Sequence, residues 1–395
     1  MVKEIKKDVF WLGVVDWDIR DFHGYKTSEG STYNSYLIKD EKNVLIDTVK
    51  EHMCNDLLVN ISKVINPLDI DYIVVNHVEK DHSGCVEKLV KISNATIVTN
   101  AKGKEHLERY YNTEDWEFLI VDSGDELNIG NRTLTFVKTP MLHWPDNMVT
   151  YSPFDKILFS NDAFGQHISS SERYDYEYIN SHGEEKLINN TKEYFANILY
   201  PYKMLIPNTI NTVKELDIEL ICPSHGIIWT EKNINKVFEI YLNWANDKIE
   251  NKAVIVYDTM YNSTKKIAYA LGEGLMEQDV IVKIYNLSET PMNTVMSEIL
   301  DAKYVLIGSP TLNNNIYPEV SKFLAYMEGL KPANKIGVAF GSYGWMESAT
   351  NKINEVFKNL NFNIVEDNCL KVKFKPHNDE LHNIRDFATK LADLE

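Results

Sequence analysis

The sequence predicts an α/β protein built from two domains, and three observations lead to this fold class. From residue 253 onward, apolar strands alternate regularly with helical patterns, as they do in a doubly wound parallel sheet. Before residue 246 the chain is richer in short apolar strands, with helical patterns between them. The polar run NDKIENK at residues 246–252 separates a helical pattern from an abrupt strand. We therefore expect one domain over residues 1–250 and a second over residues 251–395.

The first domain begins with a basic segment, residues 1–7, and a short apolar run at residues 9–15. The run meets Asp16 and Asp18 and offers no small-residue cleavage site, so it predicts a first strand rather than a signal peptide. Further strands are expected at residues 43–47, 72–75 and 133–137, and a hairpin at residues 149–160 that turns through residues 153–155. Helical patterns cover residues 86–92, 192–199 and 232–244.

The second domain is expected to contain five strands and five helices in alternation. The strands are predicted at residues 253–258, 280–285, 303–308, 335–340 and 363–373. The helices are predicted at about residues 264–277, 293–301, 318–329, 346–360 and 379–394. Lys371, Lys373 and Lys375 punctuate the last strand, which suits the edge of a sheet with one solvated face.

The composition limits the class of protein. The 395 residues are 44% hydrophobic and 25% charged, which is typical of a globular protein. With 41 basic and 58 acidic side chains the net charge is −17, which argues against general binding of nucleic acid or of anionic membranes. No stretch approaches the roughly 20 apolar residues of a membrane span.

The cysteines are scattered along the chain, without a C-x-x-C pair: Cys54, Cys85, Cys222 and Cys369. We therefore expect no disulfide framework, and no fused rubredoxin-type or zinc-ribbon module. The simplest expected location is the cytoplasm.

The segment NHVEKDHSG, residues 76–84, is the most informative part of the chain. It follows the strand predicted at residues 72–75, so its side chains project from a loop at the carboxyl end of a strand. Four metal-binding groups lie there within six residues: His77, Glu79, Asp81 and His82. A lone histidine is more often structural, but four such groups at this spacing favour a metal site.

Three more candidate ligands lie just beyond apolar strands: His143, Asp162 and His225. Taken singly, Asp162 also fits a turn and His143 a structural loop histidine. Their shared position favours convergence on one site, because open sheets bind ligands at the carboxyl ends of their strands. His23, in DFHGY, is a candidate for reaching this site from outside the ligand set. The other histidines are expected to be surface or structural residues: His52, His106, His167, His182, His377 and His382.

Three segments at strand ends form a candidate cofactor site in the second domain. Residues 259–264 (TMYNST) precede a helix expected to begin near Lys265, and their hydroxyl and N–H groups suit a phosphate monoester held by neutral donors. Helix-capping residues alone would look similar, and the segment is neither a Walker A nor a G-x-G-x-x-G sequence. The other two segments are SPTLNNN at residues 309–315 and GSYGW at residues 341–345.

The last of these segments supplies glycines for close backbone approach and aromatic rings that either stack on a flavin or pack within the protein. The candidate cofactor-binding residues are Thr259, Met260, Tyr261, Asn262, Ser263, Thr264, Ser309, Pro310, Thr311, Leu312, Asn313, Gly341, Ser342, Tyr343, Gly344 and Trp345.

Together these residues resemble the flavodiiron proteins, or A-type flavoproteins, a family of rubredoxin:oxygen oxidoreductases and nitric oxide reductases. The order H-x-E-x-D-H followed by His, Asp and His matches that family's ligand order, and the three segments match its flavodoxin-like half. Hydrolytic proteins of the metallo-β-lactamase fold carry H-x-H-x-D-H, whereas this chain has Glu79 at the second position. A set of carboxylates and imidazoles suits iron better than zinc. The chain departs from the simplest flavodoxin pattern at Asn262, where a glycine is often found.

The resemblance implies a metallo-β-lactamase-like αββα sandwich followed by a flavodoxin-like doubly wound parallel sheet. It also implies FMN and two iron ions per subunit. By resemblance, His77, Glu79 and His143 would bind one iron, and Asp162 would bridge the two. Asp81, His82 and His225 would bind the other iron, and no catalytic residue beyond the metal ligands is assigned.

The activity that the resemblance implies is the reductive detoxification of gases. Electrons from a separate carrier such as rubredoxin would pass through FMN to the irons, where O₂ becomes water, or two NO become N₂O and water. A head-to-tail homodimer, or a dimer of dimers, would place the FMN of one subunit opposite the irons of another. The ligands do not distinguish O₂ from NO. Candidates for the surrounding pocket, which also fit a packing role, are Tyr25, Trp144 and Tyr202.

Two other classes of function remain open from the sequence. One is a zinc hydrolase of the metallo-β-lactamase fold fused to a flavin-binding regulatory domain. Glu79 and the full set of flavin segments count against it, whereas bound zinc with hydrolytic turnover would favour it. The other is a redox sensor or electron carrier with a structural metal site, which requires closed coordination and no turnover of gas.

Overall fold

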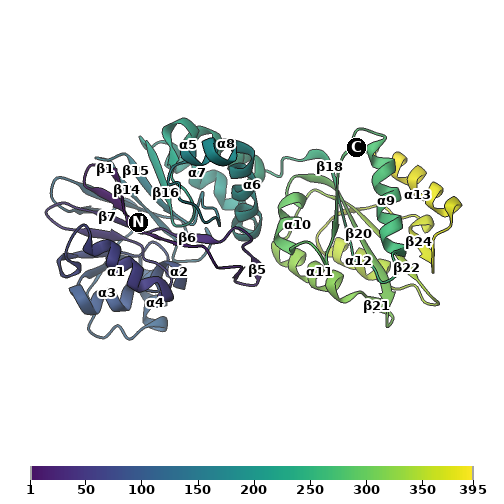
Figure 1. Cartoon of the computed structure of the whole chain (residues 1–395). Helices are drawn as coiled ribbons and strands as arrows, with labels where there is room; N and C mark the ends of the chain where they lie inside the picture. Colours follow the sequence, from purple (N-terminus) through teal and green to yellow (C-terminus); the bar gives the residue numbers. More distant parts are fainter. Residues whose placement is uncertain (1, 394–395) are drawn as a thin grey trace. The chain divides into compact units, whose positions relative to one another are not determined.

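The computed structural model describes residues 2–393, and the chain divides into two compact units (Figure 1). Unit 1 comprises Met1–Phe195 and Tyr202–Leu242, and unit 2 comprises Ala196–Pro201 and Asn243–Glu395. The chain therefore enters unit 2 briefly, returns to complete unit 1, and crosses for the last time at residues 242 and 243. The sequence analysis expected a single boundary at residues 250 and 251, so it did not anticipate the short segment Ala196–Pro201 in unit 2.

Unit 1 contains two large sheets. The first has the order β1-β2-β7-β8-β9-β10-β11, with β1 (Lys3–Lys6), β2 (Val9–Trp11), β7 (Tyr36–Ile38), β8 (Val44–Ile46), β9 (Tyr72–Val74), β10 (Thr96–Thr99) and β11 (Phe118–Ile120). The second has the order β12-β13-β14-β15-β16-β17, with β12 (Glu126–Asn128), β13 (Thr133–Lys138), β14 (Met148–Ser152), β15 (Ile157–Asn161), β16 (Leu220–Pro223) and β17 (Trp229–Thr230). Two short pairs lie apart from them: β3 (Val14–Asp16) with β6 (Ser31–Tyr33), and β4 (Asp21–Phe22) with β5 (Tyr25–Lys26).

The two large sheets of unit 1 share one apolar core. Trp11, Val74 and Val98 of the first sheet pack in the same cluster as Phe136 and Phe159 of the second. Helices cover the outer faces of the sheets (Figure 1): α1 (Cys54–Ser62), α3 (Val86–Ser93) and α4 (Ala101–Tyr110) on one side, and α5 (Asp175–His182), α6 (Glu184–Tyr194), α7 (Ile206–Lys214) and α8 (Glu231–Ala245) on the other. Short helical turns complete the unit: η1 (Glu51–Met53), η2 (Pro67–Asp69) and α2 (Lys80–Ser83), while η4 (Tyr200–Leu205) carries the chain back from unit 2 into unit 1. This layer order confirms the αββα sandwich.

Two elements of unit 1 differ from the prediction. Residues 9–15 are not one first strand: β1 precedes them, and they form β2 and β3, which belong to different sheets. At Gly13, between β2 and β3, a Cβ atom would lie 2.4 Å from the carbonyl oxygen of Tyr33, so the backbone touches the neighbouring segment where it leaves the first sheet. The helix expected at residues 192–199 is the end of α6 followed by a π-helix, η3 (Phe195–Leu199), where the chain leaves unit 1.

A disulfide joins Cys54 and Cys85, contrary to the expectation from the scattered cysteines. The two residues are 31 positions apart in the sequence, and their Cα atoms lie 5.4 Å apart. Cys54 begins α1, and Cys85 lies between α2 and α3, so the packing of these helices brings the two sulfur atoms together. Cys222 and Cys369 are free thiols.

Unit 2 is built on one parallel sheet with the order β19-β18-β20-β22-β23. Its strands are β18 (Glu250–Tyr257), β19 (Ile281–Asn286), β20 (Ala302–Leu312), β22 (Ile336–Tyr343) and β23 (Asn363–Ile364), while β21 (Asn315–Ile316) pairs with β20, and β24 (Lys371–Lys373) with β22. Helices α9 (Ser263–Met276) and α13 (Asn378–Leu391) pack on one face, and α10 (Met292–Ile299), α11 (Pro318–Leu330) and α12 (Ala349–Asn359) on the other (Figure 1). When the five principal strands are numbered by their order along the chain, they lie across the sheet in the order 2-1-3-4-5. This order confirms the flavodoxin-like doubly wound sheet.

Several elements of unit 2 begin or end differently from the prediction. β20 continues to Leu312 and β22 to Tyr343, and α9 begins at Ser263 rather than near Lys265, so each expected cofactor segment lies partly inside regular structure. The strand expected at residues 363–373 is broken into β23 and β24 by the turn η5 (Asn368–Leu370). Asp367 causes the break, because its carboxylate accepts a hydrogen bond from the backbone N–H of Cys369 at 2.8 Å. Among residues 2–393, no helix has both the length and the apolar character needed to cross a lipid bilayer.

Candidate metal centre and cofactor site

The seven candidate metal ligands of unit 1 come from the ends of strands in both of its sheets. His77 and Glu79 follow β9 of the first sheet, and α2, directly after them, carries Asp81 and His82. In the second sheet, His143 lies between β13 and β14, Asp162 follows β15, and His225 follows β16. The structure brings all seven into two neighbouring groups: His77, Glu79, His143 and Asp162, and Asp81, His82 and His225. Within each group, one potential ligand atom per residue lies within 4.8 Å of the others.

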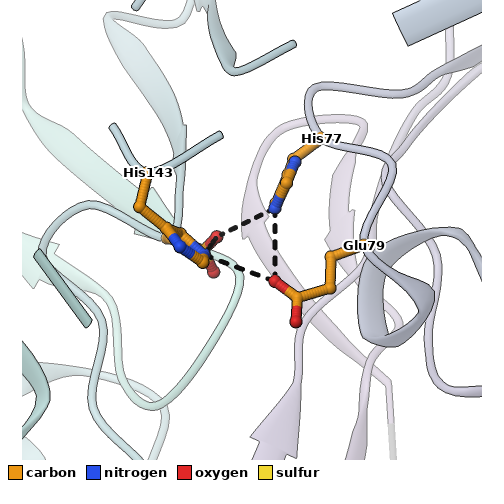
Figure 2. A group of neighbouring side chains, drawn as sticks. His77, Glu79 and His143 are labelled. Atoms are coloured by element: carbon orange, nitrogen blue, oxygen red, sulfur yellow. Dashed lines mark hydrogen bonds and ion pairs between the residues drawn. The ribbon is translucent and has the colours of Figure 1, made fainter. Parts of the chain in front are cut away.

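In the first group, the imidazoles of His77 and His143 point toward the carboxylate of Glu79 (Figure 2). Glu79 Oε2 lies 3.3 Å from Nε2 of each histidine. Asp162 Oδ2 completes the group, 3.4 Å from His143 Nε2 and 3.8 Å from His77 Nε2. The Nε2 atoms and carboxylate oxygens thus surround one small volume.

In the second group, Asp162 contributes its other oxygen. Asp162 Oδ1 lies 2.9 Å from His82 Nε2 and 3.5 Å from His225 Nε2. Asp81 lies on the same side, with Oδ2 at 3.0 Å from His225 Nε2 and Oδ1 at 3.5 Å from His82 Nε2. Since its two oxygens face different groups, Asp162 has the geometry of a carboxylate that can bridge two cations.

Hydrogen bonds behind the ligands fix which imidazole nitrogen is available. His225 Nδ1 lies 2.7 Å from the carbonyl oxygen of Thr32, which can only accept, so Nδ1 carries the proton and Nε2 keeps its lone pair. His77 Nδ1 lies 2.9 Å from Asp146 Oδ2, and Asp146 is itself held by the backbone N–H of Val78 at 2.7 Å. A metal-binding histidine commonly makes such a contact through its second nitrogen, because the contact orients the ring and raises its basicity.

The loop that carries His225 is clamped by Asn34. The side-chain amide of Asn34 donates to the carbonyl oxygens of Pro223 at 2.8 Å and Gly226 at 3.0 Å, on either side of the ligand. The backbone N–H of Asn34 donates to the carbonyl oxygen of Ser224 at 2.8 Å. These bonds hold the loop in one conformation, and the sequence analysis did not single out this residue.

Three residues around the ligands extend the site. Tyr194 donates its hydroxyl to Asp162 Oδ1 at 2.9 Å, and the partly exposed His23 places Nδ1 2.8 Å from Glu79 Oε1. His167, expected to be a surface or structural residue, is half-buried, and its ring lies 4.8 Å from that of His225, centroid to centroid, and 4.9 Å from that of Tyr194. His167 follows Asp162 by five residues, so its proximity to a ligand loop was the only signal in the sequence.

The structure places the other aromatic and histidine candidates as follows. The ring of Trp144 lies 5.0 Å from that of His77, and the ring of Tyr25 lies 5.8 Å from that of His167. Tyr202 lies at the kink of η4, outside these ring contacts. His106 reaches the site indirectly, with Nδ1 3.1 Å from Asp146 Oδ1.

The imidazoles and carboxylates of the two groups shift one another's pKa values. Burial alone would lower the pKa of His77, but hydrogen bonds to Asp146 and Glu79 outweigh it and raise the pKa to about 10. Burial would also lower the pKa values of His143 and His82, but nearby carboxylates outweigh it. They raise the pKa of His143 to about 10 and that of His82 to about 9. Burial opposes ionisation of the three carboxylates, Glu79, Asp81 and Asp162. The neighbouring imidazoles outweigh this effect and hold the carboxylate pKa values below the ordinary range. Cations would take the place of the imidazolium protons.

The residues of the two groups fit metal ions. Asp81 Oδ1, His82 Nε2 and Asp162 Oδ2 are buried polar atoms that make no hydrogen bond within residues 2–393. Buried polar atoms without partners are costly, and they recur at sites that bind an ion. Four imidazoles and three carboxylates form a mixed nitrogen and oxygen donor set, which suits iron.

In unit 2, the three expected cofactor segments meet at the carboxyl end of the sheet. β18, β20 and β22 are neighbours, with Tyr257 opposite Gly308 and Gly308 opposite Phe340, so the residues that follow them are adjacent. Thr264 Oγ1 in the first turn of α9 lies 3.1 Å from Ser342 Oγ in β22. Gly341 lets β22 approach β20 at this end of the sheet, because a Cβ atom there would lie 2.2 Å from the carbonyl oxygen of Ser309.

The segment before α9 fits a phosphate group. Asn262 precedes the helix with φ of 63°, a left-handed conformation that asparagine tolerates better than most residues, so Asn262 fills the position of the glycine often found there. Thr259 Oγ1 is buried and makes no hydrogen bond within residues 2–393. The first turn of α9 carries no acidic residue, so its N–H groups face no competing carboxylate on their own helix.

Large side chains stand exposed in the loops at this edge. Tyr261 is 88% exposed and Trp345 85% exposed, and Met260 lies half-exposed beside Tyr261 in the sequence. Single exposed apolar side chains are ordinary, but exposed aromatic rings from two loops at one sheet edge are available to cover a planar ring.

Comparisons with known proteins agree with this architecture. Residues 32–226 match the family model described as ODP family beta lactamase, and residues 255–387 match the flavodoxin family model. The nitric oxide reductase of Moorella thermoacetica is 39% identical over 98% of this chain and 97% of its own.

Two solved structures are also similar over the whole chain. The rubredoxin oxygen:oxidoreductase of Desulfovibrio gigas has 38% identity and a TM-score of 0.95, with 100% of this chain and 98% of that chain covered. The flavodiiron protein of Giardia intestinalis has 34% identity and a TM-score of 0.95, with 100% and 96% covered. The resemblance inferred from the ligand order is therefore confirmed: the chain is an oxidoreductase that belongs to the flavodiiron protein family.

Proposed function

We propose that the chain binds two iron ions in unit 1 and FMN in unit 2, and that it reduces O₂, NO or both. The observation that carries the metal assignment is the position of Asp162, whose Oδ2 faces His77 and His143 while Oδ1 faces His82 and His225. The flavodoxin match, the left-handed Asn262 and the buried free hydroxyl of Thr259 support FMN.

Each ligand has a role that follows from its contacts. His77, Glu79 and His143 would hold one iron, Asp81, His82 and His225 the other, and Asp162 would bridge them. When bound, the irons supply electrons and open coordination positions to a diatomic gas, and FMN supplies electrons singly. The carboxylates balance the positive charge, and the Tyr194 hydroxyl holds the bridging carboxylate in place through its bond to Oδ1.

The protein around the ligands restricts water and fixes geometry. The ring of Trp144 lies against that of His77, and the ring of the half-buried His167 against that of His225. Asp146 and the Thr32 carbonyl hold two of the imidazoles in one tautomer and orientation. The chain thus holds these ligand side chains in fixed orientations, in which they would bind the irons.

The choice between O₂ and NO is tested by supplying both gases in parallel. Protein loaded with iron and FMN is reduced under anaerobic conditions, and the loss of each gas is recorded. Loss of O₂ to water without released peroxide would establish an oxygen reductase, and loss of NO with formation of N₂O a nitric oxide reductase. If iron and FMN are bound and neither gas is consumed, the proposal fails. Bound zinc with hydrolytic turnover would instead favour the hydrolase.

We propose a separate electron carrier such as rubredoxin as the donor. The name of the Desulfovibrio gigas relative pairs rubredoxin with oxygen, which supports this choice of carrier. Stopped-flow mixing of reduced rubredoxin with the oxidised protein is expected to show flavin reduction. Flavin that stays oxidised with rubredoxin, but is reduced by another donor, would contradict this part of the proposal.

We also propose a head-to-tail homodimer, or a dimer of dimers, in the cytoplasm. The exposed Tyr261 and Trp345 at the FMN loops offer an apolar surface for the neighbouring subunit. Coexpression of Asp162→Ala, which lacks the bridge, with Ser263→Arg, which blocks the phosphate segment, tests this arrangement. Mixed dimers are expected to recover part of the activity that each variant lacks alone. A monomer in sedimentation experiments would contradict it.

A further inference from the structure

The disulfide of unit 1 lies beside the segment that carries two candidate ligands. Cys85 follows His82 by three residues, and Cys54 is the first residue of α1. Cys85 is 1% exposed and Cys54 6% exposed, so the cross-link is buried. The disulfide therefore ties α1 to the end of α2, the short helix on which Asp81 and His82 lie.

The two cross-linked segments also touch through their backbones. Thr48 donates to the carbonyl oxygen of His82 twice, from its backbone N–H at 2.8 Å and from its hydroxyl at 2.6 Å. A Cβ atom at Gly84 would lie 2.5 Å from Glu51 N and 2.8 Å from Val49 O, so the backbones of the two segments are in direct contact there. A shift of residues 48–54 must therefore displace residues 80–85.

The helix that carries these ligands depends on that support. α2 has four residues, Lys80–Ser83, and so short a helix is not stable in isolation. Asp81 and His82 face the second ligand group, and His82 Nε2 lies 2.9 Å from the shared Asp162. The first group takes His77 and Glu79 from the loop just before this helix, and His143 and Asp162 from other loops. The cross-link thus bears more directly on the second group than on the first.

We propose that Cys54 and Cys85 form a reversible disulfide that determines how firmly the second ligand group, Asp81, His82 and His225, holds its metal ion. In the oxidised state the cross-link holds residues 80–85 against residues 48–54. In the dithiol state these segments separate more easily, and the ion at the second group leaves faster. The inference rests on the metal-binding part of the proposed function and is independent of which gas is reduced.

The chemistry is a thiol–disulfide exchange. A dithiol reductant donates two electrons and two protons, the bond between the two sulfur atoms breaks, and each cysteine takes one proton while the reductant becomes a disulfide. A disulfide oxidant reverses the exchange. Oxidising conditions, which accompany exposure to O₂, would therefore lock the second ligand group.

A count of thiols tests whether the cross-link forms. Protein exposed to an oxidised dithiol is denatured and alkylated, and peptide mass spectrometry locates the label. We expect alkylation of Cys222 and Cys369 only, and of all four cysteines after treatment with dithiothreitol. Alkylation of Cys54 and Cys85 in the oxidised sample would overturn the inference.

Metal release tests what the cross-link does. Protein loaded with Fe²⁺ without oxygen is mixed with a chelator before and after reduction with dithiothreitol. We expect one of the two ions to leave roughly 10- to 100-fold faster from the reduced protein, the range seen when residues behind metal ligands are removed. Cys54→Ser/Cys85→Ser should release it at the fast rate with or without reductant. Cys369→Ser, which removes a free thiol in unit 2, is the control and should keep the dependence on reductant.

The outcomes separate this inference from the proposed function. Circular dichroism establishes that the variants fold, and Cys54→Ser alone serves if the double variant does not, since serine has nearly the shape of cysteine. Equal release rates in the oxidised, reduced and variant proteins would overturn the inference and leave the metal centre intact. A protein that binds no Fe²⁺ in either redox state would overturn the metal centre, and the inference with it.

Discussion

At the scale of single residues, the carboxylate of Asp146 contacts two histidines, one of which belongs to the first ligand group. It contacts His77 Nδ1 at 2.9 Å and His106 Nδ1 at 3.1 Å, and it accepts from the backbone N–H of Val78. Asp146 is fully buried, so a structural and a metal-related role must be distinguished experimentally. Asp175 offers the comparison, because it is equally buried and accepts from Thr230 and Asn233 of unit 1.

We therefore expect Asp146→Ala to weaken metal binding at the first group by about 10- to 100-fold, because the ring of His77 loses the contact that orients it. Asp175→Ala should destabilise the fold about as much as Asp146→Ala does, but it should leave the metal affinity unchanged. Competition titrations with a chromogenic chelator give the affinity, and thermal melts give the stability. Equal affinities in the two variants would mean that Asp146 acts only through the fold.

The raised pKa values of the site histidines lead to a pH dependence of the metal-free protein. His77, His82 and His143 have folded-state pKa values of about 10, 9 and 10, above the ordinary 6.5. Their contribution to stability is fully present below pH 6.5 and is lost as the pH rises through 9 to 10. The lowered pKa of Glu79 acts oppositely: its contribution is present above the ordinary 4.5 and is lost in acid.

The metal-free protein should therefore be most stable between about pH 4.5 and 6.5, and metal binding at pH 7 should release protons from the imidazoles. Calorimetric titration with Fe²⁺ in buffers of different ionisation enthalpy measures that release. A binding enthalpy that does not vary with the buffer would show that the histidines are already neutral at pH 7.

At the scale of elements, most candidate ligands and cofactor residues share one position: at, or just beyond, the carboxyl ends of strands. In unit 1 this holds for β9, β15 and β16, and in unit 2 for β18, β20 and β22. The hydrophobic pattern locates such strands well, because buried strands are continuous apolar runs. It locates their ends poorly, since β20 and β22 run several polar residues beyond the apolar part.

The start of α9 gives a test at this scale. Asn262 has φ of 63°, so Asn262→Gly should change the stability of unit 2 by no more than a few tenths of a kcal/mol. Asn262→Val should lower it by about 1–2 kcal/mol, because a left-handed conformation is costly for a side chain with a branched Cβ. The distorted segment should also bind FMN less tightly, which flavin fluorescence quenching measures. Equal FMN affinity in the glycine and valine variants would show that this backbone conformation is not needed for the phosphate.

At the scale of the whole molecule, the two units have separate cores and separate sites. The cores contain no shared residue, and the candidate metal ligands and flavin segments belong to different units. We expect two calorimetric unfolding transitions. Metal ions should raise the midpoint of one transition and FMN that of the other, because each ligand stabilises only the unit that binds it. A single transition raised by both ligands would show that the units unfold together.

The sequence by itself determined the two-domain α/β organisation, and it singled out the seven candidate ligands and the candidate cofactor segments. These features depend on local information: the period of apolar residues, the breaks between elements and the clustering of chemically distinctive side chains. Because H-x-E-x-D-H lies within six residues, its ligand chemistry is visible without any knowledge of the fold.

Only the tertiary structure decided the features that join distant parts of the chain. The Cys54–Cys85 disulfide spans 31 residues, Asp146 meets His77 across 69, and Asn34 clamps a loop almost 200 residues away. No local pattern marks such pairs, since burial and hydrogen bonding at these sites depend on how the two sheets and their loops pack together. The resemblance implied that Asp162 bridges two irons, but only the tertiary structure showed that Oδ2 faces His77 while Oδ1 faces His82.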